Sequence, residues 1–320
     1  TLKRPENINS IENLMLLCMG CHRHVDRQAA EYPRHRLESM KRAHEDHVRE
    51  AMRQRPDLRT HIVVFKAPIG GSPVHIHDQH IRDAIEPRHA VSSSWSSIDL
   101  NGLASQGETQ AYYEAAREQI REEIGSLHRR SSFLSDPAHV SLFALGPIPL
   151  LVDFGARWSD KISTDFYQRH QDTEDWAWKT GGDQACYTFS KIKDGPATAP
   201  VVLQLALSGA IDPKDLPPDI SGDATVYEIS LGNRARDRTF LKTRDDLDGF
   251  RLAYVEALGK IAAAHGVGTA LNLIPAIPAP VAVICGRARH PKAHGPLRVF
   301  DMRRDKSGYI FRFEVTHDRA

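Results

Sequence analysis

A pattern of proline and glycine that occurs twice is the feature that most limits how this 320-residue chain can fold. Two apolar segments lie 131 residues apart, since 278 − 147 = 131, and they share residue types at several positions. The matched pairs are Pro147 and Pro278, Pro149 and Pro280, Val152 and Val283, Gly155 and Gly286, and Lys161 and Lys292. We interpret this repeat as an internal duplication of two α/β units.

The hydrophobic pattern around the repeat is typical of alternating strands and helices. In the first half it predicts strands at 61–65, 98–100 and 164–170, helices at 78–86 and 110–127, and an apolar strand over 140–154 that prolines interrupt. In the second half it predicts a strand at 226–231, a helix at 250–265 and another proline-broken strand region over 271–284. Strands that are apolar on both faces favour mostly parallel sheets covered by helices. Two such α/β units would share a crevice at their strand ends, where ligands bind.

Side chains with metal-binding chemistry lie close together near the start of the chain, before a predicted helix at 37–53. Asn13, Cys18, Cys21 and His22 fall within ten residues, and Gly20 suits a tight turn between the cysteines. Three interpretations are open at this point. The cysteines are buried thiols in an ordinary turn, or a c-type haem attachment site of the form Cys-x-x-Cys-His, or half of a tetrahedral zinc site that needs two more ligands.

Composition excludes some classes of protein. The formal net charge of +1 gives no strong overall attraction to nucleic acid, although residues 1–56 carry eleven Lys and Arg against eight Asp and Glu. No apolar run is long enough to span a membrane and no secretion signal is visible, while four cysteines are too few for a disulfide framework. We therefore expect a cytoplasmic protein, and because the chain starts with Thr1 we expect the gene product to begin earlier.

The N-terminal stretch resembles the second half of an HNH endonuclease, which has the ββα-metal fold. The resemblance rests on Asn13, Leu14, Leu16 and Leu17, on Cys18, Cys21, His22 and Asp26, and on a continuation through residues 31–45. It implies that Asn13 supports the catalytic loop, that His22 binds a catalytic Mg²⁺ or Mn²⁺, and that Cys18 and Cys21 bind a structural Zn²⁺. The general-base histidine and the first cysteine pair of that family would precede Thr1.

The remainder, roughly residues 57–320, resembles the SAVED domain, a fusion of two CARF-like units that binds cyclic oligonucleotides. The residues that carry the resemblance are 140–149 (VSLFALGPIP) with Gly155, 166–170 (FYQRH), Trp176 and Trp178, and Ile277, Pro278 and Pro280. An HNH domain joined to SAVED is the architecture of effector nucleases in CBASS, a bacterial anti-phage system. This implies an α/β fold with a partial HNH module at 1–56 and two CARF or Rossmann-like units at 57–194 and 195–320.

A cyclic nucleotide needs flat groups for its bases and cations for its phosphates. The candidates for stacking are Trp95, Tyr167, Arg169 and Trp178, and those for phosphates are Lys66, Arg157, Lys161, Arg287 and Lys292. Gly146 provides a turn near the ligand, Gln168 could read a base edge, and Pro147 and Pro278 shape the strand ends. Each also has a simpler interpretation, in which Trp178 shares a core-facing strand surface with Trp176 and Trp95 points to solvent.

These resemblances together predict a metal-dependent endonuclease that a cyclic di- or trinucleotide activates and that cleaves double-stranded DNA in anti-phage defence. The family implies a homo-oligomer, a dimer that becomes a tetramer on activation. Two alternatives are a cyclic-nucleotide-binding regulator without nuclease activity and a zinc-stabilised DNA-binding regulator.

Overall fold

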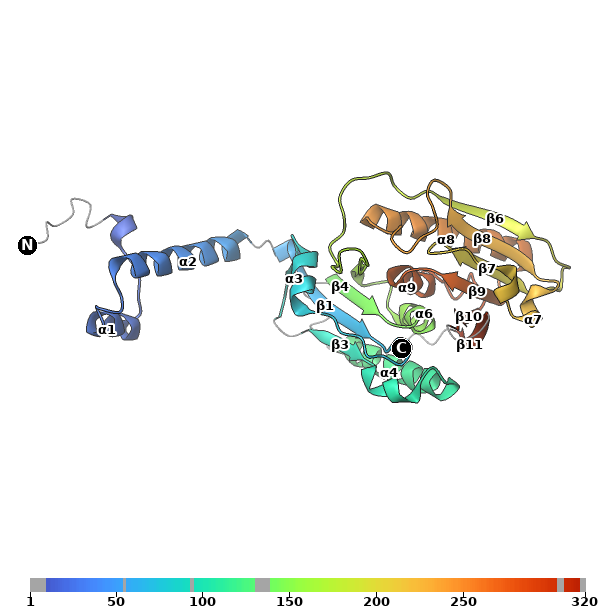
Figure 1. Cartoon of the computed structure of the whole chain (residues 1–320), viewed down its shortest axis with the longest axis horizontal. Coiled ribbons are helices and arrows are strands. Elements are labelled where there is room, and N and C mark those ends of the chain that lie inside the picture. Colours follow the sequence, from blue (N-terminus) through green and yellow to red (C-terminus); the bar gives the residue numbers. More distant parts are fainter. Residues whose placement is uncertain (1–9, 54–55, 93–94, 130–138, 304–307, 317–320) are drawn as a thin grey trace, which may run out of the picture. The chain divides into compact units, whose positions relative to one another are not determined.

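The computed structural model describes residues 10–53, 56–92, 95–129, 139–303 and 308–316. Contacts within the chain divide it into two compact units, Thr1–Leu58 and Arg59–Ala320. The division falls two residues beyond the predicted boundary at 56/57. Figure 1 shows the helices and strands of both units with their labels. No helix in the described ranges is both long and apolar enough to cross a membrane.

The smaller unit is helical over its described residues. Its elements are η1 (Ile11–Asn13), α1 (Met19–Arg27), α2 (Arg34–Arg53) and η2 (Pro56–Leu58). The tight turn predicted between Cys18 and Cys21 is wrong, because Cys18 is the N-cap of α1 and Gly20 lies inside that helix. Cys18 Sγ accepts a hydrogen bond from the Cys21 backbone N–H at 3.5 Å, so the thiol takes the place of the usual capping oxygen.

The first sheet of the larger unit is parallel. Its strands are β1 (Arg59–Lys66), β2 (His89–Ala90), β3 (Ser96–Asp99), β4 (His139–Leu145) and β5 (Ser163–Tyr167). β1 lies centrally, with β4 on one side followed by β5, while β2 pairs with the start of β1 and β3 with its end. The helical elements of this half are α3 (Asp78–Ile85), η3 (Asn101–Gln106), α4 (Gln110–Arg129) and α6 (Ile148–Arg157).

The second sheet repeats that arrangement and extends it. Its strands are β6 (Tyr187–Lys193), β7 (Val201–Ala206), β8 (Thr225–Leu231), β9 (Leu271–Ala276), β10 (Leu297–Met302) and β11 (Tyr309–Val315). The parallel order β8-β7-β9-β10 matches β3-β1-β4-β5, and antiparallel β6 and β11 are added at the edges. The helical elements are η4 (Pro213–Asp215), α7 (Pro218–Ser221), α8 (Arg244–His265) and α9 (Ala279–Arg287). The prediction of an α/β protein with mostly parallel sheets is confirmed.

The repeated prolines begin helices and do not interrupt strands, so the strands predicted over 140–154 and 271–284 are wrong in their second parts. β4 ends at Leu145 and β9 ends at Ala276. Pro147 and Pro278 are then the N-caps of α6 and α9, and Pro149 and Pro280 occupy the second helical position of each. A proline suits the first turn because the N–H it lacks has no partner within a helix.

The repeated glycines lie where α6 and α9 contact each other, and Figure 1 shows these two helices side by side. A Cβ at Gly155 on α6 would lie 2.0 Å from the carbonyl oxygen of Val283 on α9. A Cβ at Gly286 on α9 would lie 1.9 Å from the carbonyl oxygen of Val152 on α6. The four residues are two pairs at the 131-residue offset, so the two helices contact each other reciprocally, as in a two-fold interface. The main apolar core is continuous across this crossing and contains residues of both halves.

Candidate functional site

A cavity of about 510 Å³ lies at the carboxyl ends of strands from both sheets, and we call it the crevice. The first half contributes Leu145, Gly146, Ile148, Gln168, Arg169, Gln171 and Glu174. The second half contributes Ser208, Arg238, Ile277, Pro278 and Ala279. These residues follow β4, β5, β7, β8 and β9 or begin α6 and α9, so the crevice occupies the place that the repeat predicted.

Two helix N-termini meet the crevice. Ile148 is the first residue of α6 and Ala279 the first of α9, and both line the cavity. Backbone N–H groups in a first helical turn have no carbonyl partner within the helix, and the helix dipole adds a partial positive charge there. Gly146, just before α6, packs closely against the residue after β1, since a Cβ at Gly146 would lie 2.9 Å from the Cβ of Ala67. The second position of each helix is a proline, which has no N–H, so the backbone donors that the crevice offers to a phosphate are those of the other residues in these first turns.

Two arginines add positive charge to the lining of the crevice. Within the described residues, the guanidinium groups of Arg169 and Arg238 make no ion pair or hydrogen bond, although both line the crevice. Glu174 is the carboxylate of the lining, and its φ of 55° places a non-glycine residue in the left-handed region. Backbone strain of this kind costs about 1–3 kcal/mol and concentrates at ligand sites.

Gln168 presents an unused hydrogen-bond acceptor. Its side chain is 7 % exposed, its Nε2 donates to the Arg169 carbonyl at 2.5 Å, and its Oε1 is buried without a partner. Leaving such an atom unpaired costs about 1–3 kcal/mol. A ligand donor, such as the exocyclic amino group of a base, would satisfy it.

The crevice therefore brings together only part of the residues expected to contact a ligand. Gly146, Gln168, Arg169 and Pro278 line it, and Pro147 is buried beside them as the N-cap of α6.

Several of the expected phosphate ligands have protein partners elsewhere. Lys66 pairs with Asp99 at 2.6 Å, and Arg157 pairs with Asp153 at 2.8 Å. Arg287 donates to the Ile162 carbonyl at 2.7 Å. Lys161 and Lys292 are exposed in loops away from the crevice lining.

The expected stacking residues other than Arg169 also lie outside the crevice lining. Tyr167 is buried, with its ring stacked on Phe143 at 4.4 Å. Trp178 is partly buried and donates through Nε1 to the Phe166 carbonyl, while the Trp95 ring lies under the Arg82 guanidinium at 5.3 Å.

Sequence reasoning missed most of the second-half lining, although one signal pointed to it. The 131-residue offset maps Gly146 onto Ile277 and Ile148 onto Ala279, and all four line the crevice. The offset therefore located symmetric lining residues. No comparable signal marked Arg238, which lies in the loop between β8 and α8.

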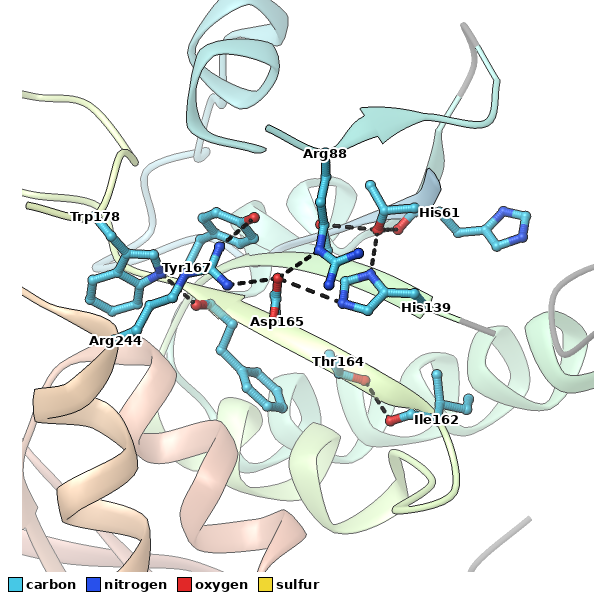
Figure 2. Close-up of polar contacts among 12 residues, drawn as sticks. His61, Arg88, His139, Ile162, Thr164, Asp165, Tyr167, Trp178 and Arg244 are labelled. Carbon is cyan, nitrogen blue, oxygen red and sulfur yellow. Dashed lines mark hydrogen bonds and ion pairs between the residues drawn. The ribbon is translucent and has the colours of Figure 1, made fainter. Parts of the chain in front are cut away.

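A polar network centred on Asp165 supports the β5 end of the crevice (Figure 2). Asp165 accepts hydrogen bonds from Arg88 Nε at 3.1 Å and from Arg244 Nη1 at 2.8 Å, and His139 Nε2 lies 3.6 Å away. Arg244 Nη2 also donates to Tyr167 Oη at 3.1 Å. Burial alone would raise the pKa of Asp165, but the His139 contact and the Arg244 guanidinium together hold it below its usual range.

This network ties β5 of the first half to the N-terminus of α8 in the second half. Gln168 and Arg169 directly follow β5, so the Asp165 network positions the segment that enters the crevice.

The smaller unit carries the two cysteines and the histidine that the sequence suggested as metal ligands. The thiols of Cys18 and Cys21 are exposed at the start of α1. The Cys21 N–H that donates to Cys18 lowers the pKa of the Cys18 thiol, whereas the contact with Cys18 raises the pKa of the Cys21 thiol. His22 is exposed, with its Nδ1 2.9 Å from Asp26. Among the described residues no three His, Cys, Asp or Glu side chains gather into a metal-binding group. The donors present therefore do not make up a complete site for zinc or magnesium, and we derive no chemical step through a metal.

Comparison with known proteins identifies the fold of the larger unit. The model of the SMODS-associated and fused to various effectors sensor domain, SAVED, matches residues 112–315, well over half of the chain. No curated protein sequence matches.

Among solved structures, the Acinetobacter baumannii Cap4 SAVED/CARF-domain containing receptor with the cyclic trinucleotide 3'3'3'-cAAA has a TM-score of 0.51 and 12% identity. That match covers 81% of this chain and 52% of the receptor, so the chain spans about half the length of this relative. A further structure of the receptor has a TM-score of 0.49, 12% identity and coverage of 98% and 66%, respectively.

Proposed function

This chain belongs to the SAVED family of sensor domains, and we propose that it binds a cyclic oligonucleotide in the crevice. The observation that carries the proposal is the convergence of two helix N-termini with Arg169 and Arg238, neither of which pairs with a carboxylate of the described residues. A cyclic di- or trinucleotide carries phosphates at regular intervals around a ring. A pseudo-symmetric site that spans both halves can meet phosphates on opposite sides of such a ring.

The lining supports a division of roles. The first turns of α6 and α9 and the two guanidiniums would hold phosphates through charge-assisted hydrogen bonds. Gln168 Oε1 would accept a hydrogen bond from a base, and the apolar side chains of Ile148 and Ile277 would cover the sugar or base faces. A volume of about 510 Å³ falls within the usual 300–1,000 Å³ range of ligand sites.

Calorimetric titration of the full chain with a panel of cyclic di- and trinucleotides tests this proposal. We expect saturable binding of at least one, and Arg238→Ala should weaken it about tenfold, since a hydrogen bond to a charged group contributes about 1.5 kcal/mol or more. Arg236→Ala is the matched control, because Arg236 lies in the same exposed loop, pairs with Glu228 at 2.8 Å and does not line the crevice. Equal losses in the two variants would place the ligand elsewhere.

We further propose that the smaller unit is part of an HNH-type nuclease that ligand binding activates. The support is the sequence resemblance at Asn13 and His22, the paired thiols of Cys18 and Cys21, and the exposure of large apolar side chains. Ile11, Leu14, Leu16 and Met19 are 80%, 55%, 99% and 74% exposed, which is the surface that further protein would cover. In this proposal, a cyclic di- or trinucleotide favours a different assembly of subunits, from dimer to tetramer, and the assembly cleaves double-stranded DNA with Mg²⁺ or Mn²⁺.

Plasmid cleavage by the full-length protein with Mg²⁺ tests the nuclease proposal separately from ligand binding. We expect degradation only when the bound cyclic nucleotide is present, and none for His22→Ala. Saturable ligand binding without any cleavage would favour the alternative of a regulatory protein. Retarded DNA mobility without cleavage would favour a zinc-stabilised DNA-binding regulator.

A further inference from the structure

A second cavity of about 390 Å³ lies beside α8 and the C-terminal end of α9, and it shares no lining residue with the crevice. Its charged lining consists of Arg251, Arg287, Arg289 and Asp160, together with His290. Its apolar lining includes Phe166, Val255 and Ile284. Three guanidiniums against one carboxylate give this cavity a positive balance.

Arg289 is the residue that packing alone explains least. It is 4% exposed, its Nε donates to the Gly295 carbonyl at 2.5 Å and its Nη2 to the His294 carbonyl at 3.5 Å, while its Nη1 is buried without a partner. No carboxylate of the described residues lies within ion-pair distance of it; burial lowers its pKa, and Tyr254 and the Glu314 carboxylate only partly oppose that shift. A buried guanidinium without a counter-charge is unfavourable unless another anion compensates it.

The internal repeat shows that this position does not require a cation. The 131-residue offset maps Arg289 onto Trp158 of the first half, a tryptophan that is 1% exposed and fills its site. An apolar residue therefore serves in the equivalent place. Arg289 in the second half therefore has another explanation, which is an anion bound in the cavity next to it.

Attraction to the C-terminus of α9 explains only some of the arginines that line the second cavity. A helix C-terminus attracts positive charge, and Arg287 donates to the carbonyls of Ser159 and Ile162 near that end. Arg251 is not explained in this way, because it lies on α8 and its nearest carboxylate, Asp248, is 3.8 Å away at an exposed site. Within the described structure, Arg289 thus has no carboxylate at ion-pair distance, and Arg251 has only the long, exposed contact with Asp248.

We propose that this second cavity binds a phosphate-bearing small molecule, with Arg251 and Arg289 on its phosphate oxygens and Phe166 in its apolar wall. Guanidinium groups match phosphate geometry and donate two parallel hydrogen bonds to it. The volume suits a ligand of nucleotide size, and the apolar residues would cover its uncharged part. The site is separate from the crevice, so it would bind its ligand whether or not a cyclic oligonucleotide is bound.

Titration of the full chain with inorganic pyrophosphate tests the assignment. We expect saturable binding that Arg251→Ala weakens about tenfold. Arg121→Ala is the matched control: like Arg251 it is about half exposed on a long helix, with an acidic residue three positions earlier. Arg121→Ala should change the affinity less than twofold.

A second pair of variants keeps the test independent of folding defects and of the crevice. Arg289→Met should also lose pyrophosphate binding, with its folding checked by circular dichroism, and Arg238→Ala should retain it. The proposal is overturned if pyrophosphate fails to bind at millimolar concentration, if Arg121→Ala and Arg251→Ala weaken it equally, or if Arg238→Ala abolishes it, since the anion would then occupy the crevice.

Discussion

Replacing Gly155 with alanine should destabilise the larger unit strongly, because α6 and α9 touch at their backbones there. The added Cβ would lie 2.0 Å from the Val283 carbonyl oxygen, whereas such contacts essentially never fall below 3.0 Å. The helices would have to separate by about 1 Å, and a gap of that size forfeits up to half of the dispersion energy at the contact. Overpacking costs about 1–3 kcal/mol or more. Alanine also gains about 1 kcal/mol in helix propensity, so we expect a net loss of about 2 kcal/mol.

Gly259 provides a matched control for this substitution. It lies within α8, and a Cβ there would meet nothing within 4 Å. Gly259→Ala should therefore stabilise the protein by about 0.5–1 kcal/mol through helix propensity alone. Differential scanning calorimetry should show a Tm lowered by about 4–8 °C for Gly155→Ala and raised by about 1–4 °C for Gly259→Ala. Equal shifts of the same sign would refute the close crossing of α6 and α9.

Two further predictions concern partly buried carboxylates, and a third concerns the helix crossing. Asp165→Asn should lower the free energy of unfolding by about 2 kcal/mol at pH 7, because two arginines would lose their carboxylate partner. This loss should shrink below about pH 4, since a carboxylate with a depressed pKa stabilises the fold only while it is ionised. Urea unfolding at several pH values measures the loss, and a loss that stayed constant with pH would contradict the prediction. Burial raises the pKa of Asp301 to about 6. The free energy of unfolding of the wild type, relative to that of Asp301→Asn, should therefore fall as the pH rises from 4 through 6. Urea unfolding of both proteins would reject the prediction if this difference did not change with pH. Gly286→Ala should destabilise as Gly155→Ala does, whereas a neutral effect by calorimetry would mean that the crossing is not reciprocal.

The duplicated architecture was predictable because its markers impose local backbone requirements. Pro147 and Pro278 mark helix starts, and Gly155 and Gly286 mark a helix crossing. Both halves of the chain carry these residue types at matching positions, even where their other residues differ. The segments that contain them were nevertheless predicted as strands. A short apolar run reads alike as a buried strand or a buried helix, and α6 and α9 have only ten and nine residues.

The candidate site was only partly predictable, since the sequence does not show which cations already have partners. Lys66 and Arg157 suit a phosphate by residue type, but Asp99 and Asp153 neutralise them in the folded chain. Arg238 has no motif around it and reaches the crevice only through the packing of its loop. Strands β6, β7, β10 and β11 were also missed, β6 because its exposed residues leave no strong apolar pattern.

Hydrogen–deuterium exchange with and without a saturating cyclic oligonucleotide tests most directly whether the ligand lies in the crevice. Backbone amides that line a ligand site exchange more slowly when it is occupied. We predict protection at residues 145–151, 168–174 and 277–282, with no change at 251–255 around the second cavity. Saturable binding that left those three segments unprotected, or that protected only the second cavity, would contradict the assignment of the crevice.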